Sequence, residues 1–196
     1  MTVLVHICCA PCLLAVLDAI RTAGHQVRGF FYNPNIQPLI EFRRRLKAVQ
    51  VLNEALRLPI DYDETYDLDA FLSGAVNAGA RRCEACYRDR LTRAARQAKR
   101  AACDAFTTTL LASTHQKHEW LRRIGEDVAQ GEGVPFLYRD WRALAEPAHR
   151  EAKRRQLYLQ AYCGCVYSEY ERFRDTTRHV YRGTPAGGKD GEDASR

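Results

Sequence analysis

Cysteine is the residue type in this sequence whose number and spacing point most directly to chemistry. Seven of the eight cysteines fall into three tight groups, and one stands alone. The groups are Cys8, Cys9 and Cys12, then Cys83 and Cys86, then Cys163 and Cys165, and the isolated residue is Cys103. Thiolates ligate metals and exchange electrons, and a reducing compartment disfavours structural disulfides. The grouping therefore indicates a metal site, a redox site or both.

Four of these cysteines form a candidate ligand set for a metal centre. They are Cys8, Cys9, Cys83 and Cys86. Four thiolates suit either zinc or a [4Fe–4S] cluster. Two adjacent cysteines fit one small tetrahedral ion poorly, whereas the corners of a cuboidal cluster lie further apart. The spacing favours the cluster, and a zinc ion that pins two loops together is the alternative.

Cys163 and Cys165 are left over once four ligands are assigned. A disulfide closed over the single residue Gly164 is strained, and strained disulfides are the labile, catalytic ones. The pair is therefore expected to relay electrons as a redox-active dithiol. The alternative is that one of the two is a cluster ligand.

The remaining thiols and the histidines have less specific interpretations. Cys12 stands C-x-x-C from Cys9 and either ligates an additional metal beside the cluster or is a free thiol in a first helical turn. Cys103 is expected to be a small buried apolar residue. His6 is expected to be a hydrogen-bonded core histidine, and a position after a strand end leaves His115 and His118 able to face the site.

The first cysteine group stands where a strand gives way to a helix. Val3 to Ile7 is an apolar, β-branched run that predicts a buried strand, and Pro11 suits the first turn of the helix that follows. Ligands of open α/β sheets bind at the carboxyl ends of the strands, and a helix N-terminus favours thiolates. Cys83 and Cys86 are expected in a second loop that precedes a helix, along the same edge of the sheet.

Strand-like and helix-like segments alternate along the rest of the chain. Further strands are expected at 27–32, 60–62, 106–111 and 134–138. Helices are expected at 39–57, before 79, up to about 102, after 115 and from about 147 to 161. This alternation predicts an α/β fold of three layers built on a mainly parallel sheet.

The length and composition fit one globular domain with a polar end. The 196 residues suit a single domain, expected over 1–182, and the Gly-rich segment 183–196 is expected to be a disordered tail. No apolar run approaches the roughly 20 residues of a membrane span, and the first strand is too short for a signal peptide. We therefore expect a cytoplasmic protein without a membrane partner. Neither G-x-G-x-x-G nor G-x-x-x-x-G-K-S/T is present, so bound NAD or ATP is not expected.

Basic residues gather at three places in the sequence. The net charge is +6, and the clusters lie at 43–45, 88–100 and 153–155. Several tyrosines accompany them, and basic residues with exposed aromatics can grip RNA phosphates and stack unpaired bases. Solvated helix faces are the alternative interpretation.

Taken together, five motifs resemble one enzyme family. They are H-I-C-C-A-P-C, F-Y-N-P-N-I, R-C-E-A-C-Y-R-x-R-L, T-T-T-L and Y-C-G-C-V-Y-S. In this order they resemble the cobalamin-independent epoxyqueuosine reductases (QueH family) over residues 2 to about 174. The resemblance implies a Rossmann-like fold of the adenine-nucleotide α-hydrolase-like (HUP) type. It also implies an oxidoreductase that reduces the epoxide of epoxyqueuosine to queuosine at the tRNA wobble position, the last step of queuosine formation.

The resemblance also implies roles for individual cysteines. Cys8, Cys9, Cys83 and Cys86 would hold a [4Fe–4S] cluster, and Cys163 and Cys165 would form a redox-active disulfide. Some family members place a second iron beside the cluster, with an aspartate ligand where this chain has Cys12, so here a thiolate would replace it or that metal would be missing. The implied partners are tRNA carrying epoxyqueuosine in its anticodon and an unidentified electron donor.

Two other classes of function remain open on the sequence. One is a tRNA-thiolating or thiol–disulfide enzyme on the same fold, and an ATP requirement would favour the thiolating enzyme. The other is a zinc-bound RNA-binding module without catalytic activity.

Overall fold

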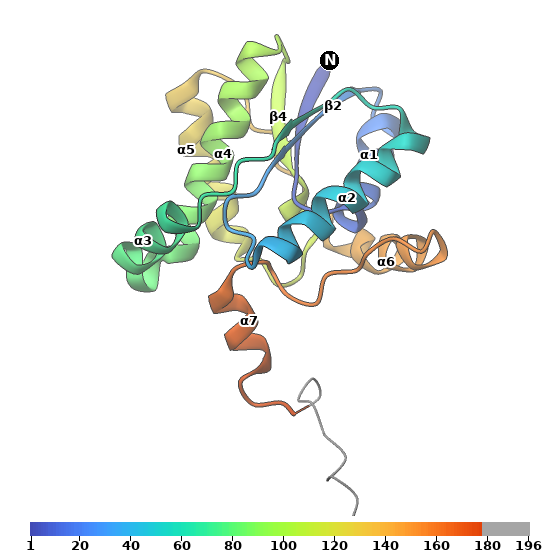
Figure 1. Cartoon of the computed structure of the whole chain (residues 1–196). Coiled ribbons are helices and arrows are strands. Elements are labelled where there is room, and N and C mark those ends of the chain that lie inside the picture. Colours follow the sequence, from blue (N-terminus) through green and yellow to red (C-terminus); the bar gives the residue numbers. More distant parts are fainter. Residues whose placement is uncertain (178–196) are drawn as a thin grey trace, which may run out of the picture.

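A four-stranded parallel sheet forms the centre of the molecule in the computed structural model, which describes residues 1–177 (Figure 1). The strands are β1 (Thr2–Ile7), β2 (Gln26–Tyr32), β3 (Ile60–Asp63) and β4 (Ala105–Thr108), in the order β3-β2-β1-β4. All three pairings are parallel. β1 is central and buried along nearly its whole length, as a strand covered on both faces must be. The expected α/β fold with a parallel sheet is confirmed.

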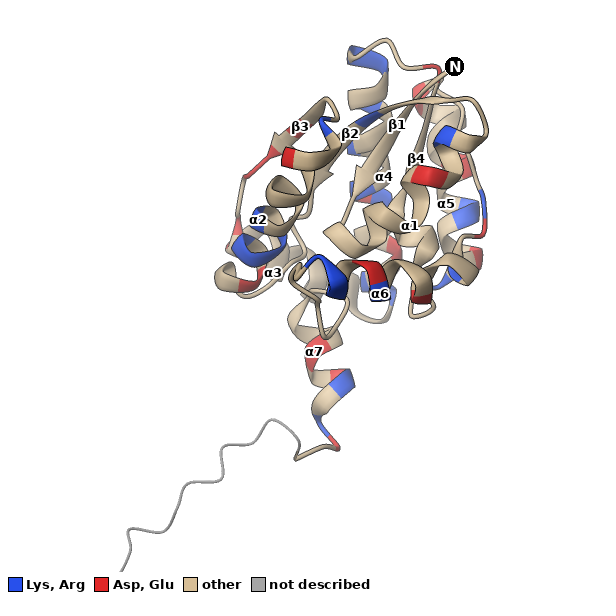
Figure 2. Ribbon diagram, turned by 90° about the vertical axis from the view of Figure 1, so that its right-hand side faces the viewer, with Lys and Arg blue, Asp and Glu red and all other residues tan. Residues whose placement is uncertain are grey.

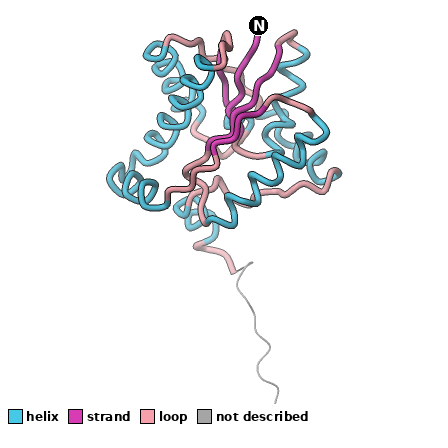
Figure 3. The backbone as a smooth tube through the Cα atoms, turned by 45° about the horizontal axis from the view of Figure 1, so that its top comes forward, coloured by secondary structure: helices cyan, strands magenta, loops and turns pink. Residues whose placement is uncertain are grey.

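Helices cover both faces of this sheet. They are α1 (Ala10–Thr22), α2 (Leu39–Leu56), α3 (Leu68–Ala78), α4 (Arg82–Arg100), α5 (His118–Glu132), α6 (Ala145–Arg154) and α7 (Val166–Phe173). α1 and α2 lie on one side of the strands, and α4 and α5 lie on the other (Figures 1 and 3). α6 packs on the outside of α1. The result is the three-layer arrangement that the alternation of segments predicts.

The strand expected at 134–138 is reduced to a single bridge between Phe106 and Phe136. Phe106 exchanges two backbone hydrogen bonds, donating to the Pro135 carbonyl at 2.9 Å and accepting from Leu137 at 2.8 Å. Pro135 has no N–H to donate, so the ladder does not extend. The expected strand 106–111 is also shorter, because β4 ends at Thr108 and a 3₁₀ turn, Thr109–Ala112, follows.

The last basic helix is shorter than its sequence predicts. α6 ends at Arg154, and Gln156 adopts a left-handed φ of 55° that no helix continues through. The chain from 157 to 162 is then non-helical and leads to Cys163. The α6 end therefore delivers the third cysteine group to the sheet edge.

Two expectations from the sequence concern membrane-spanning helices and the end of the chain. Within residues 1–177, no helix combines the length and apolar character needed to cross a bilayer. The expected tail at 183–196, and the final residues of the expected domain at 1–182, lie outside the described residues.

Candidate functional site

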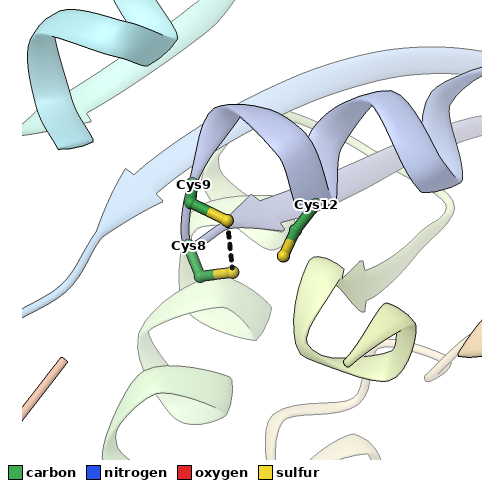
Figure 4. Close-up of side chains that lie close together, drawn as sticks. All are labelled: Cys8, Cys9 and Cys12. Carbon is green, nitrogen blue, oxygen red and sulfur yellow. Dashed lines mark hydrogen bonds between the residues drawn. The ribbon is translucent and has the colours of Figure 1, made fainter. Parts of the chain in front are cut away.

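The loop between β1 and α1 brings three thiols together. Cys8 directly follows β1, Cys9 is the N-cap of α1, and Cys12 lies in the first helical turn with Pro11 before it. The three sulfur atoms all lie within 4.8 Å of one another, with 3.6 Å between Cys8 and Cys9 (Figure 4). Cys8 and Cys9 are buried and Cys12 is half-buried. Cys12, whose role the sequence left open, therefore joins the other two.

Hydrogen bonds concentrate negative charge on Cys8 in this group. Hydrogen bonds with Cys12 and Cys9 and the positive charge of Arg90 lower the pKa of Cys8 well below the ordinary value. The Thr109 hydroxyl also donates to the Cys8 sulfur at 3.1 Å. The same interactions raise the pKa of Cys12, and burial raises that of Cys9. Cys8 is therefore the thiol of this group that loses its proton most readily, and binding of a metal cation would favour deprotonation of all three.

Arg90 supplies a buried positive charge that the thiols share. Its side chain is 1% exposed, and its Nη2 donates to Asn33 Oδ1 at 2.6 Å. Its charge acts on Cys86, Cys8 and Cys163, one from each cysteine group. A buried guanidinium requires negative partners, so Arg90 marks the point where the three groups converge. Sequence reasoning missed this role and counted Arg90 with the surface cations, although its four-residue spacing from Cys86 on one helix could have indicated it.

Cys83 and Cys86 lie within the first two turns of α4, whereas the sequence predicted a loop before the helix. Burial raises the pKa of Cys86 to about 12, and Cys83 shifts in the same direction for the same reason. Over residues 1–177, the set of potential ligands compact enough to hold a metal ion is Cys8, Cys9 and Cys12. Cys83 and Cys86 are therefore not part of this compact group.

Cys163 and Cys165 reach the site from the segment before α7, and both are free thiols. Gln116 donates from Nε2 to the Cys163 sulfur at 3.2 Å, and the Tyr87 hydroxyl in turn donates to Gln116 Oε1 at 2.7 Å. Cys165 caps α7, accepting from the Ser168 N–H at 3.4 Å. Burial raises the pKa of Cys163. Both thiols are half-buried, but their surroundings differ, because Cys163 accepts a hydrogen bond from Gln116 and Cys165 lies at a helix start.

A second buried arginine fixes the segment that carries these thiols. Arg45 is 2% exposed and donates to the backbone carbonyls of Cys163, at 2.8 Å, and Tyr162, at 2.9 Å. It also pairs with buried Glu41 at 2.7 Å. Of the cluster at 43–45, Arg45 is thus neither part of a solvated helix face nor available to phosphates, because it holds the backbone in place.

A cavity of about 820 Å³ opens beside the thiols. Cys8, Cys12 and Cys163 all line it, and His115 stands at its edge. Gln160 also lines it and donates from Nε2 to the Cys9 sulfur at 2.9 Å, a contact that nothing in the sequence indicated. Three thiols from two distant segments thus face one space that can admit a substrate. A second cavity, of about 410 Å³, lies between α3 and α4, and Cys86 is among the residues that line it.

The isolated residues behave as the sequence predicts. His6 is fully buried, with Nδ1 at 2.8 Å from Thr108 Oγ1 and Nε2 at 2.9 Å from the Tyr32 carbonyl oxygen. Cys103 is buried. His118 is also buried and lies 3.2 Å from the Ser113 carbonyl oxygen, so of the two later histidines it is His115 that faces the large cavity.

Comparison with known proteins identifies the family. The family model described as epoxyqueuosine reductase QueH matches residues 3–171. This chain belongs to the QueH family. It is 36% identical over 180 residues to the epoxyqueuosine reductase QueH of Thermotoga maritima, covering 87% of this chain and 92% of that protein. The QueH protein of Dehalococcoides mccartyi is 34% identical over 170 residues, with 87% and 93% covered.

A longer relative shows the same match over part of its length. The QueH protein of Helicobacter pylori is 32% identical over 179 residues, which cover 84% of this chain and 48% of that protein. The resemblance inferred from the five motifs is thus confirmed. QueH proteins are oxidoreductases that carry out the last step of queuosine biosynthesis, and the thiols described above lie within the matched range.

Proposed function

We propose that this chain reduces the epoxide of epoxyqueuosine, within tRNA, to the alkene of queuosine. Family membership supports the reaction, and the observation that carries its location is the cavity lined by Cys8, Cys12 and Cys163. The balanced reaction takes up two electrons and two protons and releases one water. The walls of the cavity would surround the epoxide ring and limit the water around it.

A [4Fe–4S] cluster held by Cys8, Cys9, Cys83 and Cys86 fits the donors of this site. The four thiols come from two segments, and Arg90 interacts electrostatically with Cys8 from the first segment and with Cys86 from the second. Such a cluster, when bound, supplies single electrons and an oxygen-seeking iron. The place of Cys12 beside Cys8 and Cys9 supports an additional iron there, with a thiolate as its ligand.

Hydrogen bonds and one buried cation would oppose the effect of burial, which by itself favours thiols at most of these cysteines. Thr109 and Gln160 donate hydrogen bonds to sulfur, and the buried charge of Arg90 offsets the negative charge. These contacts also orient the sulfurs.

Cys163 and Cys165 would store the two electrons that one turnover needs. Oxidation of the two thiols to a disulfide releases two electrons and two protons, which matches the demand of epoxide reduction. An external one-electron donor would restore the thiols. We expect the protein to work in the cytoplasm, with tRNA and that donor as partners and without bound NAD or ATP.

The direct test uses cluster-loaded protein, tRNA carrying epoxyqueuosine and a chemical reductant without oxygen or cobalamin. Mass spectrometry of the digested tRNA should show that the modified nucleoside loses one oxygen. Cys163→Ser and Cys165→Ser should keep their iron but lose multiple turnover. An epoxide that stays intact with loaded protein would contradict the proposal, and acceleration by ATP with sulfur gained would favour thiolation.

A further inference from the structure

A shallow groove on the outer face of α2 carries positive charge with no acidic residue in its lining. Its volume is about 440 Å³, and Arg43, Arg44 and Lys47 line it together with Tyr158. Ile40 and Val51, 53% and 41% exposed, complete its apolar part. Figure 2 shows the basic segments on α2 and α6 near this region.

Most other basic surfaces of this protein are neutralised by carboxylates. On α4, Arg88 pairs with Asp127 at 3.0 Å and Arg96 with Glu132 at 2.8 Å, and Arg122 on α5 pairs with Glu126 at 3.0 Å. On α6, Arg154 and Arg155 both pair with Glu151.

The α2 cations differ from these paired residues. In residues 1–177, Arg43, Arg44 and Lys47 have no carboxylate within ion-pair distance. Within the same residues, the other two basic clusters also keep unpaired cations, Lys99 and Arg100 in one and Lys153 in the other, but the α2 groove gathers three of them in one lining without an acidic residue.

The groove also offers a stacking surface. The Arg44 guanidinium lies over the Tyr158 ring, 5.8 Å from its centroid. Arg43 and Lys47 are one helical turn apart, so their charges lie along one line of the helix surface. A row of cations beside an aromatic ring covered by arginine matches the alternating phosphates and bases of an unpaired RNA strand.

Hydrogen bonds connect this groove to the thiols. The Tyr158 hydroxyl donates to Glu41, and Glu41 pairs with Arg45. Arg45 then holds the carbonyls of Tyr162 and Cys163. A strand that occupied the groove would therefore lie next to the segment that positions Cys163.

We propose that this groove binds the sugar–phosphate backbone of the tRNA substrate, close to the nucleotide that is reduced. The inference rests on the proposed function. An acidic electron-donor protein would meet the same charges, but the Arg44–Tyr158 stack and the exposed apolar residues favour RNA, whose bases have flat apolar faces.

The test compares two triple variants that each remove three positive charges. Arg43→Gln/Arg44→Gln/Lys47→Gln changes the groove, and Arg88→Gln/Arg96→Gln/Arg122→Gln removes paired arginines on the other side of the sheet. Fluorescence anisotropy measures tRNA binding over a range of salt concentrations. The groove variant should bind about 10- to 100-fold more weakly at low salt, with a salt slope shallower by about 2, because each lost phosphate contact removes about 0.7 to 0.9. The paired variant should change much less.

Reduction assays separate RNA from a protein donor as the occupant. The groove variant should need more tRNA for half-maximal rate with a chemical reductant and should keep its iron. The proposal would be overturned if the groove variant bound tRNA with the affinity and the salt slope of the parent chain. It would also be overturned if the reduction rate of that variant fell only when a protein supplied the electrons. If the parent chain binds tRNA through the groove but leaves the epoxide intact, the groove stands and the proposed reaction fails.

Discussion

At the scale of single residues, the site depends on buried charged side chains whose burial cannot be recognised from the sequence. Arg45 and Arg90 stand in basic clusters and look like surface residues, yet both are 2% exposed or less. Arg90 is placed by the cysteines and by Asn33, which are brought near it only by the fold. Arg45 is placed by Glu41, one helical turn away, and by a backbone segment more than 100 residues later. Partners of this kind are set by tertiary structure, so residue type alone could not reveal them.

His6 gives a prediction about pH and stability. Burial, with Arg90 nearby, lowers the pKa of His6 from 6.5 to about 3. Below pH 6.5, His6 binds a proton in the unfolded chain but stays neutral in the folded chain. The free energy of unfolding therefore falls as the pH falls from 6.5 toward 3. His6 should cost about 2 kcal/mol of unfolding free energy between pH 7 and pH 5.

Urea unfolding of the parent chain and of His6→Gln at both pH values measures this cost. The variant has no group that titrates at this position, so its stability should depend less on pH by about that amount. An unchanged pH dependence in His6→Gln would contradict the account.

At the scale of elements, the sequence predicted best those segments whose environment is uniform. β1 is largely apolar, as expected for a strand with both faces covered, and α2 was predicted at 39–57 and found at Leu39–Leu56. The predictions were wrong where strand pairing or a single backbone angle determines where an element ends. Residues 134–138 have the composition of a strand but make one bridge, and α6 ends where Gln156 takes a positive φ. Neither a ladder partner nor a backbone angle can be read from side-chain periodicity.

Two glycines of α5 give a matched test of its packing against that bridge. A methyl group on Gly125 would overlap the Phe136 ring, whereas one on Gly131 would meet nothing within 4 Å. Gly125→Ala should destabilise the protein by about 1–3 kcal/mol through overpacking. Gly131→Ala should stabilise it by up to about 1 kcal/mol, because alanine favours helix. Thermal unfolding compares the two, and equal shifts would show that α5 does not pack on Phe136 as described.

At the scale of the whole molecule, the parallel sheet explains how three distant cysteine groups come together. The β1–α1 loop supplies Cys8, Cys9 and Cys12, the start of α4 supplies Cys83 and Cys86, and the segment after α6 supplies Cys163. From strand and helix order, the sequence predicted that the first two groups lie along the same edge of the sheet, but it did not place Cys163 and Cys165 there. It could not predict that Cys12 would pack closer to Cys8 and Cys9 than the α4 pair does, because that depends on side-chain placement within one helical turn.

The central claim is that two segments, the β1–α1 loop and the start of α4, hold one iron–sulfur cluster. Iron and sulfide content of anaerobically purified protein tests it most directly, in Cys8→Ser, Cys9→Ser, Cys83→Ser and Cys86→Ser, with Cys103→Ser as the control. We predict about four irons and matching sulfide per chain in the parent protein and in the control. Each of the four variants should lose most of both. Full iron in Cys83→Ser and Cys86→Ser, with loss in Cys12→Ser, would contradict the claim and assign the metal to the β1–α1 loop alone, and stoichiometric zinc in active protein would contradict it altogether.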